Sequence, residues 1–477
     1  MIEGFASYDA LLPKIWLQKI PGFGELKIPE EYPESSSVFS LDFSPEDANV
    51  IREMESNLNT EESIITEEMI PENTILGAYA GTFDVEGDPG VETLLSPVPV
   101  GPNDIGVIAM HYNETEGTWE QIEDAHIVDG YVYGTVEEFS PIAIFTIHRD
   151  TFFTSIDGYN VFVCNGIPTA FYVEDGKTYA RDANGKVTEM PSQVNILGGT
   201  IDGSDLESID ITIREGVKTQ WFKAGSFAPA DTEHVPVVKK AVVNVEGARL
   251  NGGVTGGYCA CDMNELVINV KDSYVSFSGD GESIWQKAPS ADKKEAGNSQ
   301  ITGKAKCRKS IMNFTNCTGW LIYISGNCGL MYSEECYGTV KDCKFDYVIL
   351  GGSNGGTNKS SLTVDGGEYG IIQTNNRGYI NDAVSLVIKN ATIDNLFVAG
   401  DSTDSSVTGV TGKVEKIEVN GKSEIKKLWA GTQGGESIAS NEELKALLQR
   451  IVFSRDVAYT FGEENGAELF GDMIKIK

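Results

Sequence analysis

"VKDCKFDYVILGG", residues 340–352, combines a short apolar segment, a bend, a second apolar segment and a glycine turn. A comparable phrase begins 24 residues later as "VDGGEYGIIQT", and again after another 24 as "IKNATIDNLFVAG". Short strands and turn residues at a nearly constant interval predict a solenoid, because every turn of the chain then needs the same inward residues and bends. A helical solenoid would need longer helical segments without glycine, which are absent here.

The repeat extends from about residue 195 to 435 and places one small residue in each copy. These small residues are Gly199, Ala248, Ser273, Cys317, Cys343, Gly367 and Ala391. Asp272, Asn316, Asp342, Gly366 and Asn390 stand immediately before five of them. Asp, Asn and Gly tolerate a left-handed backbone, so this position predicts a repeated bend. We expect Ser273, Cys317, Cys343, Gly367 and Ala391 to stack as a structural ladder, with successive turns about 4.8 Å apart.

The chain of 477 residues is long enough for two or three domains, and its negative charge is concentrated in the first of them. Residues 1–150 hold 30 acidic and five basic residues, a formal charge of −25, against −9 for the remainder. Such a surface disfavours nucleic-acid binding and docking on anionic lipid, and its simplest meaning is solubility. The sequence contains no run of about 18 apolar residues, so it predicts no membrane span.

Residues 1–68 are rich in proline and acidic residues and predict an extended arm or docking segment. A helix is expected to begin at Ser44 within it. The start has no basic segment followed by an apolar core, so it does not read as a secretory signal. From 69 to 150, short strands alternate with turns such as "NETEG" and "VDG".

This second stretch resembles a β-sandwich module of bacterial surface and phage proteins. The resemblance rests on Tyr112, Trp119, Gly130, Val132, Gly134, Val136, Phe139, Ser140, Pro141 and Ala143. These are packing positions, so the resemblance implies a fold and no activity.

Residues 151–435, with their repeat, resemble the right-handed parallel β-helix of pectate lyases, phage tailspikes and bacterial adhesins. The expected fold class is therefore all-β: a right-handed parallel β-helix preceded by a small β-sandwich domain and an extended N-terminal arm. Residues 436–477 predict a cap over the last turn. It would contain a helix starting near Ser440 or Asn441, with an apolar side formed by Leu444, Leu447, Leu448 and Ile451, followed by a hairpin.

The pattern of titratable residues predicts no catalytic site. The pectin-hydrolase branch of the resembled fold carries clustered Asp pairs and a His–Gly motif, and this sequence has only His111, His126, His148 and His234, with no such cluster. Lyases of that fold use calcium with an Arg or Lys base. For that role Arg377, near Asp365 and Asp382, is the best candidate, although an arginine in a solvated turn is the simpler interpretation. A pair such as Asp342 and Asp365 is not specific, because a stacked ladder places acids at glycosidase distances by accident.

Cofactor and metal motifs are also absent from the sequence, so we expect neither cofactor nor metal. Seven of the eight cysteines lie between 259 and 343, but they lack the paired spacing of zinc sites. Cys317 and Cys343 belong to the ladder, where thiols would pack as small buried groups. Cys328 and Cys336 are the pair that we would test for a disulfide.

Four aromatic residues on or beside the repeat strands are candidates for glycan contact: Trp320, Tyr347, Tyr369 and Trp429. Flat rings on the flank of a β-helix suit sugar rings, while core packing or ordinary exposure is the simpler alternative for each one.

Together these features predict a non-enzymatic structural protein of a phage virion: a head fibre, capsid decoration or tail fibre or spike. Trp16 and Phe23 in the arm would dock on capsid or tail proteins of the same particle, and the β-helix would project toward a host-surface glycan. Assembly as a trimer is compatible with such a spike. The alternatives are a polysaccharide lyase or hydrolase of tailspike type, and a bacterial adhesin on the cell surface.

Overall fold

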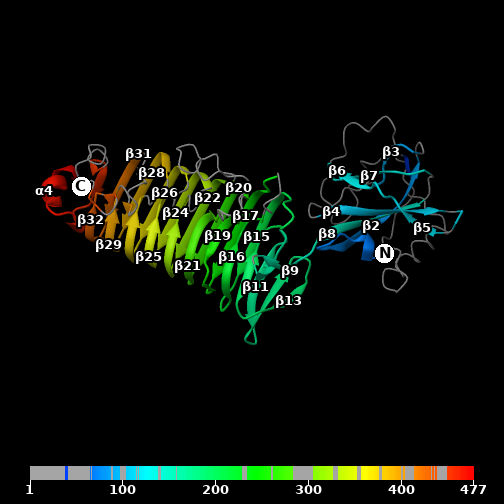
Figure 1. Cartoon of the computed structure of the whole chain (residues 1–477), viewed down its shortest axis with the longest axis horizontal. Helices are drawn as coiled ribbons and strands as arrows, with labels where there is room; N and C mark the ends of the chain where they lie inside the picture. Colours follow the sequence, from blue (N-terminus) through cyan, green and yellow to red (C-terminus); the bar gives the residue numbers. More distant parts are fainter. Residues whose placement is uncertain are drawn as a thin grey trace. The chain divides into compact units, whose positions relative to one another are not determined.

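The computed structural model of the chain forms two compact units, Met1–Asp150 and Thr151–Lys477. The described residues of both units lie mainly in strands (Figure 1), which confirms the all-β class. The structure describes residues 38–40, 65, 67–86, 90–96, 104–113, 115–116, 118–137, 141–156, 158–227, 234–258, 261–282, 305–325, 331–351, 356–374, 379–398, 401–402, 413–430, 432–433, 436–437 and 448–477.

The first unit contains two antiparallel sheets. The larger has the order β1 (Val38–Ser40), β2 (Thr74–Glu86), β8 (Pro141–Arg149), β4 (Asp104–Asn113) and β5 (Thr118–Gln121). The smaller has the order β3 (Glu92–Leu94), β7 (Tyr131–Thr135) and β6 (His126–Val128), and a short 3-10 helix, η1 (Glu67–Met69), precedes β2. Asp129 and Gly130 join β6 to β7, and both have positive φ, as a two-residue hairpin turn requires. The strand-and-turn pattern predicted from "NETEG" and "VDG" is therefore confirmed.

The packing motifs of this unit have structural roles. Tyr112 and Trp119 face each other across β4 and β5, with ring centroids 5.3 Å apart. Gly134 is required by close packing, because a Cβ there would stand 2.8 Å from Leu95 Cδ1. Of the sequence predictions, the helix at Ser44 and the docking residues Trp16 and Phe23 lie outside the described residues, as do Phe139 and Ser140.

Two large sheets make up the second unit, each with 13 described strands. The long-strand sheet has the order β13 (Val187–Met190), β12 (Lys177–Asp182), β11 (Thr169–Glu174), β15 (Leu206–Ile213), β17 (Val237–Glu246), β20 (Asp262–Lys271), β22 (Ala305–Thr315), β24 (Met331–Lys341), β26 (Gly356–Asp365), β28 (Tyr379–Lys389), β31 (Lys413–Asn420), β35 (Ile451–Phe453) and β37 (Lys475–Ile476). The short-strand sheet has the order β36 (Ala458–Phe461), β32 (Glu424–Trp429), β29 (Thr392–Phe397), β27 (Glu368–Gln373), β25 (Lys344–Ile349), β23 (Thr318–Tyr323), β21 (Tyr274–Glu282), β18 (Arg249–Leu250), β16 (Lys218–Lys223), β14 (Val194–Leu197), β10 (Tyr159–Val163) and β9 (Phe152–Ile156), with β19 (Val254–Tyr258) beside β16 and β21.

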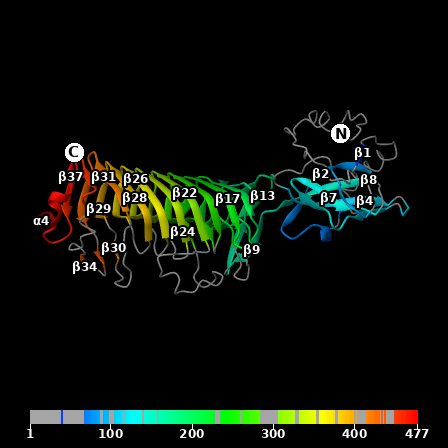
Figure 2. The same ribbon diagram turned by 90° about the horizontal axis from the view of Figure 1, so that it is seen from above.

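The chain alternates between these two sheets as it advances, so that each long strand leads through a corner to a short strand (Figure 2). We call one long strand, its corner and the following short strand a repeat. Consecutive repeats pair in parallel: β24 pairs with β26, and β25 pairs with β27. The first repeats are closed off by antiparallel pairs: β9 with β10, β11 with β12, and β12 with β13. A small sheet of β30 (Asp401–Ser402), β33 (Thr432–Gln433) and β34 (Glu436–Ser437) lies apart from the two large ones.

The core lies between the two sheets and is filled by apolar side chains in register. One column from the long strands comprises Ile213, Val245, Val270, Phe314, Val340, Val364, Ile388, Val419 and Phe453. A facing column from the short strands includes Ile322, Val348, Ile372, Leu396 and Leu428. Many of these residues are β-branched, which suits a pleated surface that is buried on one side.

The corner after each long strand confirms the predicted left-handed bend. Asp272, Asn316, Asp342 and Asn390 have φ of 50–51°, and Gly366 has φ of 74°. Their main-chain N–H groups bond to the next repeat, as in the 2.8 Å bond from Asp342 N to Asp365 O. The Asn316 amide also donates to Asp272 Oδ1 at 2.6 Å, and this bond is the main cause that lowers the pKa of Asp272.

The small residues that follow these bends are stacked and joined by hydrogen bonds. The main-chain N–H of Ala248 donates to Ser273 Oγ at 3.1 Å, and that of Cys317 donates to Cys343 Sγ at 3.3 Å. Ser273 and Cys343 in turn donate to the carbonyls two residues before them, at 2.6 and 3.1 Å. The small side chain at this position therefore provides a hydrogen-bond acceptor for the preceding repeat. Ser423 continues the ladder by accepting from Ala391 N at 3.3 Å.

Gly199, which the repeat assigned to the small-residue position, does not occupy that position. It follows β14 at the end of a short strand, where a Cβ would stand 2.3 Å from Ser226 Oγ. Close packing requires glycine both at the end of this short strand and at the ladder position of Gly367, so the residue type alone does not distinguish the two positions.

The C-terminal residues also differ from the prediction. Ile451 opens a strand, β35, and β36 continues the short-strand sheet, so 451–461 extend both sheets. The expected hairpin is replaced by a short helix, α4 (Gly466–Phe470), a 3-10 turn, η3 (Gly471–Met473), and β37, which pairs in parallel with β35. Phe470 is buried in the core, so the last repeat is covered by α4, η3 and β37 and not by a hairpin. Leu448 is buried, and the rest of the expected helix, 440–447, lies outside the described residues.

Candidate functional site

The outer face of the short-strand sheet carries an exposed aromatic pair. Trp320 on β23 and Tyr347 on β25 are 49% and 36% exposed, and their ring centroids are 6.3 Å apart at 81°. The ladder between these strands passes from Gly319–Phe345 to Leu321–Tyr347, skipping Trp320 and its counterpart.

Polar and cationic groups lie on other strands of the same sheet, with Arg249 on β18, Tyr274 on β21 and Lys344 on β25. The Arg249 guanidinium lies over the Tyr274 ring at 4.2 Å, and Tyr274 is in register with Thr318 of β23. Lys344 on β25 pairs with Glu368 at 3.0 Å. We call Arg249, Tyr274, Trp320 and Tyr347 the aromatic surface.

Buried residues beneath and beside the pair hold it in place. Leu321, Tyr323 and Ile349, on the same two strands, form a cluster separate from the main core. Gly319 and Phe345 pack on the inner side. The aromatic pair therefore stands on strands anchored from both sides, which preorganises it.

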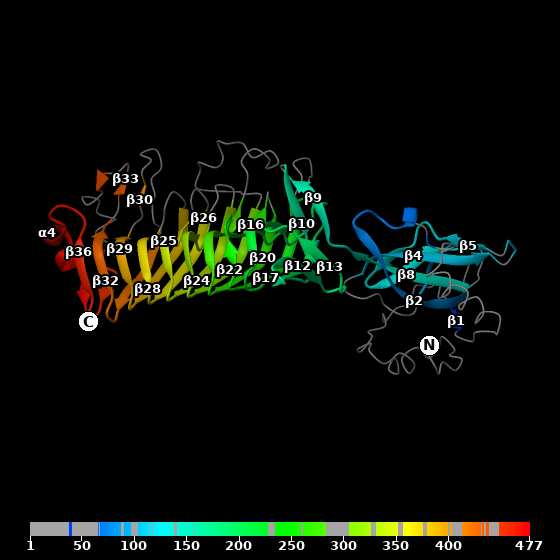
Figure 3. The ribbon, with the colours of Figure 1, turned by 90° about the horizontal axis from the view of Figure 1, so that it is seen from below.

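Trp429 is not part of the aromatic surface. It lies on β32, which β27 and β29 separate from β25. Figure 3 shows β25, β29 and β32 in this order. Its ring stacks on Phe397 at 5.7 Å and 7°, and its Nε1 donates to Asn395 Oδ1 at 3.0 Å. These contacts and its half-buried position give Trp429 a packing role.

Tyr369 is buried, with 2% exposure, and its ring does not reach the outer face. Its hydroxyl donates to Gly366 O at 3.1 Å and accepts the N–H of Cys343. A Cβ on Gly367 would stand 2.8 Å from this hydroxyl. At other ladder positions a side chain accepts the main-chain N–H of the preceding repeat. Gly367 has no side chain, so the Tyr369 hydroxyl accepts this N–H in its place. Burial raises the pKa of Tyr369, so it remains protonated.

Tyr369→Phe is expected to destabilise the second unit by about 1–3 kcal/mol, because the Cys343 N–H is left buried without its acceptor. Urea unfolding of the full chain measures the change. Tyr347→Phe is the matched control, since its hydroxyl is at the surface, and it should stay within about 0.5 kcal/mol of the parent. Equal unfolding free energies for the two variants would show that the hydroxyl does not complete the ladder.

A second surface, which the sequence analysis does not predict, lies on the outer face of the long-strand sheet. Asn244, Asn269 and Asn313 occupy one register position on consecutive strands. The Asn269 and Asn313 side-chain amides each donate a 2.9 Å hydrogen bond to the Oδ1 of the preceding asparagine in this row. They line a groove of about 870 Å³ with Arg214 and Lys271 at its edge. Each asparagine stands three residues before a left-handed bend. This constant spacing in the sequence could have predicted the row of asparagines.

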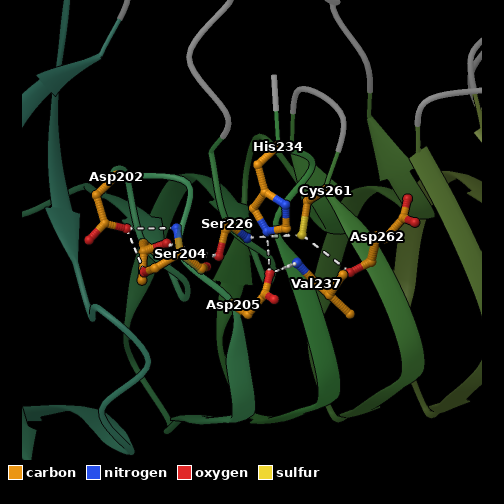
Figure 4. A network of polar contacts seen from close by, with 9 residues as sticks. Asp202, Ser204, Asp205, Ser226, His234, Val237, Cys261 and Asp262 are labelled. Carbon is orange, nitrogen blue, oxygen red and sulfur yellow. Dashed lines mark hydrogen bonds and ion pairs between the residues drawn. The ribbon is translucent and has the colours of Figure 1, made fainter. Parts of the chain in front are cut away.

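A Cys–His–Asp grouping near the start of the unit does not form a catalytic triad (Figure 4). His234 Nε2 lies 2.7 Å from Asp205 Oδ1, which also accepts the Val237 N–H at 2.8 Å. Cys261 is buried and receives the Ser226 N–H at 3.4 Å. Burial raises the pKa of the Cys261 thiol to about 12, so it is protonated at neutral pH and is a poor nucleophile.

Metal binding finds no support in the described parts of the chain, where no group of three or more His, Cys, Asp or Glu side chains could hold an ion. The first unit has a hollow lined by His111 and by several acidic residues, Glu120 among them. The described side chains there form no such group, so the hollow is not assigned as a metal centre. Arg377 and Cys328 lie outside the described residues, while Cys336 is buried on β24. Within the described ranges, no helix is long and apolar enough to cross a membrane.

Comparison with known proteins returned no match: no family model, curated protein or solved structure corresponds to this chain.

Proposed function

We propose that Thr151–Lys477 is a right-handed parallel β-helix and that residues 69–150 form a β-sandwich module. Two features support the first assignment: the chain alternates between two sheets, and successive repeats pair in parallel with a shared left-handed corner. The two antiparallel sheets of the first unit support the second. Both are the folds that the sequence resembles.

We further propose that the protein is a structural and recognition component of a phage virion. The N-terminal region would attach to capsid or tail proteins of the same particle, and the β-helix would present the aromatic surface to a glycan of the host surface. The observation that carries the recognition role is the exposed Trp320–Tyr347 pair on a rigid sheet.

The chemistry of the pair suits a sugar. One face of a pyranose ring presents C–H groups, which pack on an indole or phenol ring, while its hydroxyls need hydrogen-bond partners nearby. Arg249 on β18, Lys344 on β25 and Glu368 on β27 offer such groups on the same sheet. A rigid platform loses little conformational entropy on binding, which favours affinity.

Trp320→Ala is expected to weaken binding to a host-surface polysaccharide at least about tenfold, or about 1.4 kcal/mol, because aromatic anchors carry most of such binding energy. Biolayer interferometry of the full chain against a panel of bacterial capsular and O-antigen polysaccharides measures this loss. Tyr159→Ala, at a 47% exposed tyrosine on β10, is the matched control.

Equal binding by the parent and Trp320→Ala would refute the aromatic surface as the contact. Release of reducing or unsaturated sugars from any bound polysaccharide would favour the enzyme alternative. The virion role has its own test, immunogold labelling of purified particles with antibody against residues 195–435. Unlabelled particles would contradict that role and leave the sugar-binding result standing by itself.

A further inference from the structure

Two thiols meet at the corner of consecutive repeats in the second unit. Cys317 lies between β22 and β23, and Cys343 occupies the same position between β24 and β25. They are 1% and 2% exposed, and the Cys317 N–H donates to Cys343 Sγ at 3.3 Å. Cys343 is also the main cause that lowers the pKa of Cys317, and the same pairing raises the pKa of Cys343.

The backbone on either side holds the two residues in register. Thr315 pairs with Lys341 before the corner, and Thr318 pairs with Lys344 after it. Lys344 N also bonds to Cys317 O at 2.8 Å. Adjacent parallel strands are about 4.8 Å apart, which falls within the roughly 4.4–6.8 Å Cα separation of disulfides.

From this geometry we propose that Cys317 and Cys343 form an oxidation site, at which a peroxide converts the two thiols into a disulfide joining consecutive repeats. The Cys317 thiolate attacks one peroxide oxygen, the O–O bond breaks, and hydroxide leaves with sulfenic acid on Cys317. The Cys343 sulfur then attacks the Cys317 sulfur, the S–O bond breaks, and water leaves. Overall, two thiols and one hydrogen peroxide give one disulfide and two waters.

The burial of both sulfurs selects the oxidant. Hydrogen peroxide is close to water in size and reaches sites that glutathione disulfide does not. Two other buried thiols serve as internal comparisons: burial raises the pKa of Cys164 and of Cys261 to about 12, which leaves them without thiolate at neutral pH.

The test treats the folded full chain with hydrogen peroxide, blocks remaining thiols by alkylation, and analyses tryptic peptides by mass spectrometry. The expected product links peptide 342–344 to peptide 310–341 and disappears on reduction. Because 310–341 also contains Cys328 and Cys336, the link must be lost in Cys317→Ser and retained in Cys336→Ser. Serine already occupies this ladder position at Ser273 and Ser423, so Cys317→Ser is expected to fold.

A second readout is thermal unfolding. Oxidation should raise the midpoint of the parent protein and leave that of Cys317→Ser unchanged, because the new bond closes a loop between repeats. Persistence of the link in Cys317→Ser, its absence from the parent, or its formation only after unfolding would each overturn the proposal.

Discussion

Gly367→Ala is expected to destabilise the second unit by about 3–5 kcal/mol, one of the largest effects available to a single methyl group in this chain. Gly367 has φ of 88°, and a Cβ there would stand 2.2 Å from the Cys343 carbonyl oxygen and 2.8 Å from the Tyr369 hydroxyl. The first approach forces the main chains of two repeats apart. The second displaces the hydroxyl that accepts the Cys343 N–H.

Urea unfolding of the full chain, followed by far-UV circular dichroism, measures this loss. Gly176→Ala separates its two causes. Gly176 also has a positive φ, of 77°, but no atom lies within 4 Å of its Cβ position. The control should therefore show only the cost of the left-handed backbone, about 1–2 kcal/mol. If both variants lost the same free energy, close approach at Gly367 would not matter and the ladder described above would be wrong.

Phe345→Ala is expected to cost about 3–5 kcal/mol, because it removes a fully buried ring from the core. Phe345 packs edge-on against Phe314 of a long strand, with centroids 5.9 Å apart, and so ties the two sheets together. Its other neighbour is Gly319, whose missing side chain makes room for the ring.

The cavity left by Phe345→Ala has no simple repair. Gly319→Ala in the same chain would not fill it, since the added Cβ would meet the Val275 carbonyl oxygen. Phe345→Leu keeps most of the volume and should lose much less free energy, while Asp346→Ala, at the exposed neighbouring position of the same strand, should stay within about 0.5 kcal/mol. Comparable losses in Phe345→Ala and Asp346→Ala, measured in urea, would contradict the assignment of inner and outer faces.

The repeated bend is predictable from the sequence because its cause is local. Asp, Asn and Gly accept a left-handed backbone, and their constant spacing along the chain marks the corner. Gly199 and the C-terminal hairpin are predicted wrongly for the opposite reason. β35 and β36 pair with strands 34 residues earlier, as in Ile417 with Ile451, and β37 pairs with β35, 23 residues earlier, as in Val452 with Lys475; local composition does not encode such pairing.

The four candidate glycan-contact residues show the same division between what the sequence predicts and what only the tertiary structure decides. The sequence identifies Trp320, Tyr347, Tyr369 and Trp429 as aromatic residues beside the repeat. Only the tertiary structure separates the exposed pair, Trp320 and Tyr347, from the buried Tyr369 and the stacked Trp429. Register makes that decision: Tyr369 is aligned with the buried Phe345 and Trp429 with Phe397, whereas Tyr347 stands two residues beyond Phe345 on the same strand and is exposed.

The sequence by itself thus determined the all-β class, the repeat and the left-handed corner, because backbone preference and alternating burial act over a few residues. The tertiary structure decided which groups meet across repeats. The Tyr369 hydroxyl at the gap left by Gly367, the contact of Cys317 with Cys343 and the row of Asn244, Asn269 and Asn313 all join residues of different repeats or different strands. Such contacts depend on the lengths of the connections and the register of the sheets, and these are set only when the whole stack is assembled.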